Sequence, residues 1–162
     1  LGLPYPGGPL IDKKAALGNP KAFQFPKPKV SDLNFSFSGL KTAVLYFIQK
    51  NVAENENFIE ENINDICASL QYTIVGIVID KLKKATKITG INTIAIGGGV
   101  SANSGIRKAL LEGEHKFGWK TFIPKLEYTT DNAAMIGIVG YLKYLENNFS
   151  NNLDIANPRF KL

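Results

Sequence analysis

The segment GGGVSANSGIR, residues 97–107, follows a short apolar run and leads into residues with helical spacing. Three consecutive glycines let a backbone approach a ligand closely, and a helix that begins near Asn103 directs free amides and a positive dipole end toward it. The pattern therefore predicts a strand, a glycine-rich turn and a helix that together hold a nucleotide. The spacing leaves open an ordinary glycine turn in which Asn103 only caps its helix.

The segment matches neither of the two standard nucleotide motifs. It is not G-x-G-x-x-G with a later acidic residue, and it lacks the G-K-[ST] of a P-loop. A dinucleotide-binding Rossmann motif and a Walker motif are therefore both excluded.

The rest of the chain alternates strand-like and helix-like patterns. Predicted strands lie at 33–37, 93–96 and 121–123. Predicted helices lie at 9–17, after Ser38, and at 63–87, 103–111 and 131–145. This order predicts an α/β domain over residues 1–146 with a mostly parallel sheet, followed by an Asn-rich tail over 147–162. Because three strands are few for such a sheet and the chain begins abruptly, without Met, we expect part of the domain to be missing.

Composition narrows the class of protein further. One cysteine and one histidine exclude an internal disulfide and a self-contained Cys/His zinc site. Because neither a leader peptide nor an apolar run of spanning length is visible, we expect a soluble, cytoplasmic protein. The net charge of +5 favours contact with phosphates or nucleic acid, and lysine solvation explains it equally well. The same alternatives hold for the basic residues at 13, 14, 27 and 29.

Two further segments carry candidate site residues. In YTTDNAAMIG, Asp131 precedes a helix, where a carboxylate is a good cap; it can also supply one oxygen ligand to a metal. In PYPGGPLID, Gly8 and Asp12 are spaced so that one turn and one helix start can touch the same ligand. A proline-rich turn with a surface carboxylate is the alternative.

Other reactive residue types have simpler interpretations. His115 is expected to be exposed near a helix end, and Cys67 to be a small buried hydrophobe. Ser36 and Ser38 suit turn and cap roles because no nearby base accompanies them. Lys41 is expected to lie on the surface.

Taken in order, the segments GLPYPGGPLID, NFSFSGLKTAV, GGGVSANSGIR and TTDNAAMIG are far more specific than any one of them. Over residues 1–145 the chain resembles the tRNA N(6)-adenosine threonylcarbamoyltransferase family, formerly called the O-sialoglycoprotein endopeptidase or glycoprotease family, in its bacterial form. The resemblance implies an actin-like ATPase (ribonuclease H-like) fold, of which this chain is most of the second lobe. Asn34 stands where many relatives have Asp.

The resemblance also implies an activity and roles for residues. The family transfers threonylcarbamoyl from its adenylate to the adenosine just 3′ of the anticodon in tRNAs. Gly8 and Asp12 are then expected at the ribose, Gly97 and Gly98 beneath the nucleotide, Asn103 at the adenine, and Asp131 at an iron or zinc ion.

The metal site implied by the resemblance is incomplete in this chain. The family's His-x-x-x-His pair and its serine-glycine-glycine-His loop are absent from the sequence, so we expect the isolated chain to be inactive and metal-free. The implied partners are tRNA, an actin-like paralogue and a small ATPase. An open sheet edge and apolar face favour self-association of the chain.

Three rival functions remain at this point. A glycoprotease-type metallopeptidase fits the older family name, but the chain has no H-E-x-x-H motif. An actin-like ATPase or kinase can share the fold and the glycine-rich floor. A non-catalytic scaffold of a modification complex is the third.

Overall fold

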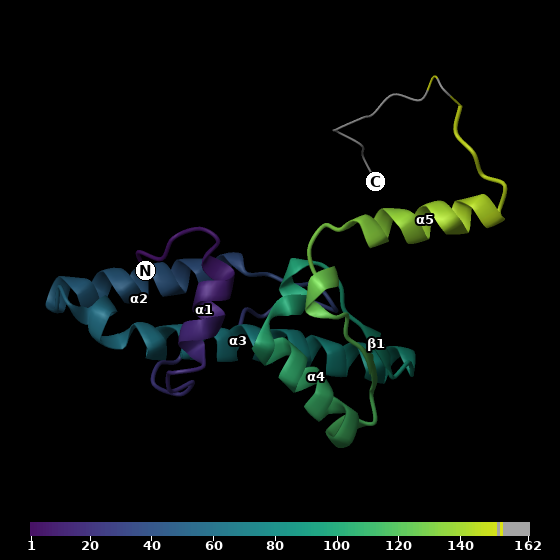
Figure 1. The fold of residues 1–162 in the computed structure, drawn as a ribbon. Coiled ribbons are helices and arrows are strands. Elements are labelled where there is room, and N and C mark those ends of the chain that lie inside the picture. Colours follow the sequence, from purple (N-terminus) through teal and green to yellow (C-terminus); the bar gives the residue numbers. More distant parts are fainter. Residues whose placement is uncertain (152, 154–162) are drawn as a thin grey trace.

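The structure, a computed structural model, describes residues 1–151 and 153. These residues are mostly helical and include one small parallel sheet (Figure 1). In chain order the elements are α1 (Gly7–Ala15), α2 (Ser38–Glu54), α3 (Phe58–Thr89), β1 (Thr93–Ala95), the 3-10 helix η1 (Gly99–Ala102), α4 (Ser104–Phe117), β2 (Lys120–Phe122), the 3-10 helix η2 (Leu126–Tyr128) and α5 (Ala133–Leu145).

Helix α3 is the central element of the fold, and α1, α2 and α4 all contact it. Its first turn carries Glu60 and Glu61, its last turn carries Lys87, and it ends at Gly90, which has a φ of 70°. These charges suit the helix dipole, and glycine adopts the left-handed end conformation without a steric penalty. By length and composition α3 is also apolar enough to cross a membrane. Because three helices pack on it and part of it is buried, α3 is better explained as a core helix.

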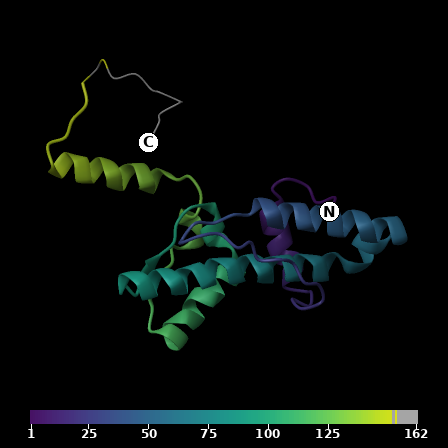
Figure 2. The same ribbon diagram turned by 180° about the vertical axis from the view of Figure 1, so that it is seen from behind.

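The loop that follows α1 is tied to α3 by hydrogen bonds. The backbone N–H of Asn19 donates to the carboxylate of Asp65 at 2.7 Å, and that of Phe23 donates to the Ser69 hydroxyl at 3.1 Å. Figures 1 and 2, which view the molecule from opposite sides, both show α1 crossing α3. These polar contacts hold the loop after α1 against the first half of α3.

Two apolar clusters pack against different parts of α3. The first consists of Ile94, Ile106, Leu110 and Trp119, with Val75 and Ile79 of α3 packed against it. The second consists of Phe25, Leu40 and Ile77, with Leu70 and Ile74 of α3 beside it. Strand β1, helix α4 and strand β2 therefore form one packing unit, while α2 and the proline-rich loop form another.

The sheet confirms the predicted parallel α/β arrangement on a small scale. Strands β1 and β2 pair in parallel, Thr93 opposite Lys120, and α4 connects them. At the end of this crossover, Glu114 of α4 accepts hydrogen bonds from the backbone N–H and the hydroxyl of Thr121. These bonds stabilise the carboxylate and lower the pKa of Glu114.

Several sequence predictions are confirmed, although α3 begins before the predicted residue 63 and α4 continues beyond the predicted residue 111. The helices predicted at 9–17, after Ser38, and at 63–87, 103–111 and 131–145 are present, as are the strands at 93–96 and 121–123. His115 is exposed and Cys67 is buried, and burial raises the pKa of the Cys67 thiol. The predicted tail is described only at 147–151 and 153; the rest of it lies outside the described residues.

Three local predictions are wrong. Residues 33–37 form no strand, and Phe35 and Phe37 are exposed with stacked rings. A strand needs a paired neighbour to satisfy its backbone, and the described residues place none beside this segment. Ser38 starts α2 without a side-chain cap bond. Asp131 does not cap α5, because Asn132 does so by accepting from the Met135 N–H at 3.1 Å.

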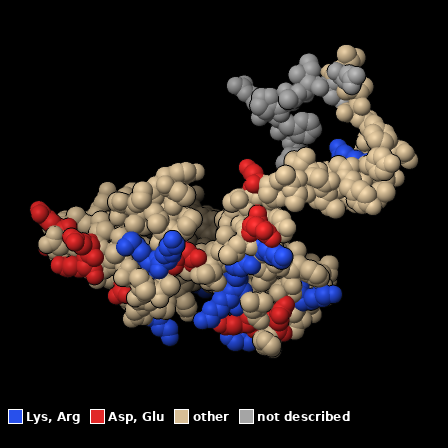
Figure 3. All heavy atoms as spheres, viewed as in Figure 1, with Lys and Arg blue, Asp and Glu red and all other residues tan. Residues whose placement is uncertain are grey.

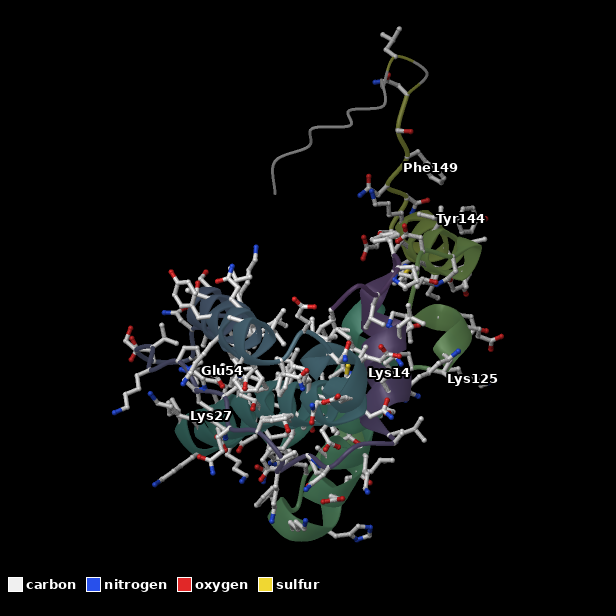
Figure 4. All side chains as sticks on the ribbon, turned by 90° about the vertical axis from the view of Figure 1, so that its left-hand side faces the viewer. Lys14, Lys27, Glu54, Lys125, Tyr144 and Phe149 are labelled. Atoms are coloured by element: carbon white, nitrogen blue, oxygen red, sulfur yellow. The ribbon has the colours of Figure 1, made fainter. Side chains whose placement is uncertain are left out.

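Helix α5 stands apart from the other helices and none of its residues is buried (Figure 1). Its side chains are apolar around the whole circumference, Ile136 being 78% exposed and Leu142 52%. Figure 3 shows few charges on it, in contrast to the acidic group at the α2–α3 connection. Figure 4 labels Tyr144 of α5 and Phe149 after it, whose ring centroids are 6.0 Å apart, away from α1, α2 and α3. Such a surface is typical of an interface.

Candidate nucleotide site

The glycine turn after β1 is held by a few local hydrogen bonds. Gly98 has a φ of 77° and a ψ of 176°, a conformation that only glycine adopts readily. Its carbonyl accepts from the Ser101 N–H at 2.9 Å and from the Ser101 hydroxyl at 2.7 Å. A Cβ at Gly97, Gly98 or Gly99 would meet no other atom within 4 Å. The run of glycine is therefore not required by packing, and it leaves an exposed stretch of bare backbone.

Asn103 sits at the junction of this turn and α4, and its side chain makes two hydrogen bonds. Its Oδ1 accepts from the Ile106 N–H at 2.9 Å, which is a helix N-cap. Its Nδ2 donates to Oε1 of Gln71 on α3 at 2.9 Å. The cap interpretation of Asn103 is thus confirmed, and one N–H of its amide is left for a ligand.

Helix α1 meets the same junction through Asp12. One carboxylate oxygen accepts from the Ser104 N–H at 3.1 Å, and the other accepts from the Ser104 hydroxyl at 2.7 Å. Gly8 lies one helical turn before Asp12, on the same face of α1. The structure therefore brings Asp12 to the first residue of α4, next to Asn103, across a sequence separation of 92 residues.

Arg107, the last residue of the segment, fastens the turn to the following loop. Its guanidinium donates to the carbonyl of Ser101 at 2.9 Å and to that of Pro124 at 2.8 Å. Pro124 precedes η2, and the chain then runs through Thr129 to Asp131. Arg107 therefore orders the loop that leads to the last candidate residue.

Asp131 is not joined to the other candidates by any hydrogen bond or ion pair among the described residues. It is exposed, and residues 1–151 with 153 contain no group of three or more His, Cys, Asp or Glu side chains that could hold a metal ion. Because a single carboxylate is a weak ligand for a divalent ion, these residues do not by themselves fit iron or zinc. The metal role of Asp131 stays a prediction.

The basic residues near the start of the chain have different environments. Lys27 pairs with Asp80 at 2.6 Å, with both side chains about half exposed. Lys13 and Lys14 lie in the last turn of α1, and Figure 4 shows Lys14 on that helix. Lys81 and Lys84 donate to the carbonyl of Asp32 at 2.7 and 3.2 Å and so hold the loop before α2. Part of the positive charge is therefore structural.

Comparison with known proteins shows which family the chain belongs to. A family model described as tRNA N6-adenosine threonylcarbamoyltransferase matches residues 1–138. The chain belongs to this family. The match includes every candidate site residue named above.

Relatives of the same name come from several bacteria. The protein of Christiangramia forsetii is 67% identical over 99% of this chain and 47% of its own length. That of Riemerella anatipestifer is 54% identical over 99% of this chain and 47% of its own length. That of Thermosipho africanus is 46% identical over 100% of this chain and 48% of its own length. The chain thus spans about half the length of the curated relatives it matches.

Two side chains at this site, Ser104 and Gln71, are not predicted from the sequence. Ser104 lies inside the motif, directly after Asn103, the residue to which the motif assigns the ligand contact. Gln71 lies on α3, 32 residues before its partner Asn103, and nothing in its local pattern separates it from other polar helix residues. Only the Ser104 contact had a usable signal, since a residue at a helix start offers a free N–H.

Proposed function

We propose that this chain is the adenylate-binding part of a transferase that moves threonylcarbamoyl from threonylcarbamoyl-adenylate to the adenosine 3′ of the tRNA anticodon. The supporting observation is the convergence of α1, α3 and the start of α4 on the bare glycine turn, through the Asp12–Ser104 and Asn103–Gln71 hydrogen bonds. We place it in the second lobe of an actin-like fold, of which β1 and β2 are part of the sheet, and in the cytoplasm.

Each candidate residue has a role that its position supports. Gly97 and Gly98 form a floor on which the nucleotide rests, because no side chain stands between it and the backbone. Gly8 and Asp12 face the ribose from α1. Asn103 contacts the adenine with its remaining N–H.

In the proposed transfer reaction, the main task of the protein is to orient the adenylate and the tRNA amine. A mixed anhydride is already activated, so the site has to hold the adenylate, exclude water and present the carbonyl carbon to the tRNA amine. The exocyclic amine of the adenosine attacks that carbon, loses a proton, and AMP leaves with the bonding electrons. No nucleophilic side chain is needed. Ser36 and Ser38 therefore have no catalytic role in this proposal.

A metal and further proteins complete the proposal. Asp131 supplies one ligand to an iron or zinc ion whose other ligands are not among the described residues of this chain. We propose tRNA as the acceptor substrate, and an actin-like paralogue and a small ATPase as partners, by analogy with the bacterial family.

Binding to the isolated chain tests the proposed site. A non-hydrolysable mimic of threonylcarbamoyl-adenylate is expected to bind more tightly than ATP in calorimetry. Asp12→Ala and Asn103→Ala each remove hydrogen bonds, which should weaken binding of the mimic about tenfold or more. Glu56→Ala, an exposed carboxylate on the α2–α3 connection, is the matched control and should not change it. Equal affinity for ATP and the mimic would favour an actin-like ATPase. If neither ligand binds, the proposed function is wrong.

The exposed α5 surface is expected to make the isolated chain self-associate through a second copy. Apolar side chains cover all sides of this helix and its single charge is Lys143, so water contact is unfavourable. Light scattering coupled to size exclusion should give a mass above 17.7 kDa that rises with concentration. Ile136→Lys should shift the mass toward the monomer, whereas Leu17→Lys, an exposed leucine after α1, should not. A monomer at every concentration contradicts the prediction.

A further inference from the structure

The amides of Asn103 and Gln71 have only one consistent orientation. The backbone N–H of Ile106 can only donate, so the Asn103 atom that it contacts at 2.9 Å must be the oxygen. The nitrogen of Asn103 then faces Gln71 and can only donate. Gln71 must therefore present its oxygen at 2.9 Å, which turns its own nitrogen the other way. One backbone donor thus sets the direction of two side-chain amides.

Packing restricts both amides to this arrangement. A Cβ on Gly105, in the first turn of α4, would lie 3.1 Å from Nε2 of Gln71, 3.1 Å from a methyl of Val75 and 3.3 Å from Oδ1 of Asn103. The absence of a side chain at Gly105 therefore lets α4 approach α3 where the amides meet. Both Gln71 and Asn103 are half-buried, which strengthens the hydrogen bond between them.

The polar atoms that stay uncommitted are donors. Within the described residues, the second N–H of Asn103 and the Nε2 of Gln71 have no hydrogen-bond partner in the protein, whereas each amide oxygen already accepts one bond. The Gln71 side lines a surface hollow of about 380 Å³ between α1, α3 and α4. A ligand edge facing this pair is bound best through acceptor atoms, such as the ring nitrogens of a purine.

We infer that Gln71 is a positioning residue: it holds the Asn103 amide so that its free N–H points to an acceptor on the nucleobase. This inference rests on the proposed function, since it assumes that Asn103 contacts the adenylate. Gln71 fixes the rotation of the Asn103 side chain by accepting from its Nδ2. Without Gln71, the Asn103 amide would be held only by the bond from the Ile106 N–H to its Oδ1.

A set of Gln71 variants tests the inference by binding of the adenylate mimic. Gln71→Leu and Gln71→Met remove the acceptor and should each weaken binding about tenfold, the effect of one lost hydrogen bond. Gln71→Glu keeps an acceptor for Asn103 and should recover most of the affinity. Gln49→Leu, an exposed glutamine on α2, is the matched control and should bind as the unaltered chain does.

A double-mutant cycle separates positioning from a merely structural role. If Gln71 acts through Asn103, then Gln71→Leu should add no loss in a chain that already carries Asn103→Ala. Additive losses, or unchanged affinity in Gln71→Leu and Gln71→Met, overturn the inference.

The side-chain amide resonance of Asn103 gives a readout that needs no ligand. It should be shifted and slowly exchanging in the unaltered chain and in Gln71→Glu, and lose both properties in Gln71→Leu. Should the mimic fail to bind the unaltered chain, the proposed function fails and this resonance decides whether Gln71 holds Asn103. A resonance unaffected by Gln71→Leu overturns the inference independently.

Discussion

Gly18→Ala is expected to destabilise the chain by about 3 kcal/mol, because a methyl group cannot be accommodated where the α1 loop meets α3. A Cβ at this position would overlap the backbone carbonyl of Asn64 and lie 2.7 Å from the backbone N of Asp65. Both atoms belong to the interior of a long helix and cannot move aside without breaking helical hydrogen bonds. The loop would have to separate from α3, which would also strain the 2.7 Å bond from Asn19 to Asp65.

This destabilisation is measured by urea unfolding and by heating. The loss corresponds to a melting temperature lower by about 10 °C for a domain of this size. Gly39→Ala serves as the matched control, because a Cβ there meets nothing within 4 Å and the residue lies in α2. It should leave stability unchanged or slightly raise it. If the two variants are equally stable, the close approach of Gly18, in the loop after α1, to α3 is wrong.

The functional consequence follows from the position of α1. Since this helix carries Gly8 and Asp12, the Gly18→Ala chain should lose affinity for the adenylate mimic together with its stability. Weak binding that persists at low temperature, where the chain is folded, would show that the Asp12–Ser104 contact is displaced as well.

Leu110→Ala is expected to cost about 3 kcal/mol through the cavity that it leaves in the core. Leu110 is 0% exposed and lies in the cluster with Ile94, Ile106 and Trp119, which joins α4 to the sheet. The neighbouring Leu111 is 51% exposed on the same helix, so Leu111→Ala removes the same atoms without opening a cavity.

The comparison of these two leucine variants is made by urea unfolding at equal protein concentration. Leu110→Ala should lower the unfolding midpoint strongly and Leu111→Ala only slightly. Similar losses would contradict the packing of α4 on β1. Below the transition, Leu110→Ala should still bind the mimic, because Asn103 and Ser104 stand at the start of α4, whereas Leu110 lies in the middle of that helix.

The central helices could be predicted because their apolar spacing is repeated over many residues. The long helix at 63–87 and the Asn103 cap both depend on contacts within a few residues. The predicted strand at 33–37 was wrong for the opposite reason. Alternation indicates which side chains share a face, but a strand forms only where another strand completes its hydrogen bonds.

The candidate site was likewise only partly predictable. Gly97, Gly98 and Asn103 follow one another in the chain, so their association is local, and the ordered set of motifs predicted the family to which the chain belongs. Asp12 had a predicted ligand role but no known partner, since Ser104 is 92 residues away. Asp131 stays a predicted ligand without companions among the described residues.

The sequence by itself determined the helices, the strands at 93–96 and 121–123, the bare glycine turn, the capping amide and the family, because each depends on short-range spacing or on ordered motifs. Only the tertiary structure decided that Gln71 orients Asn103 and that Asp12 binds the start of α4. Hydrogen bonds between distant residues depend on how helices cross, and the crossing of α1, α3 and α4 is set by packing at Gly18 and Gly105. That geometry is a property of the assembled chain and leaves no pattern in any one segment.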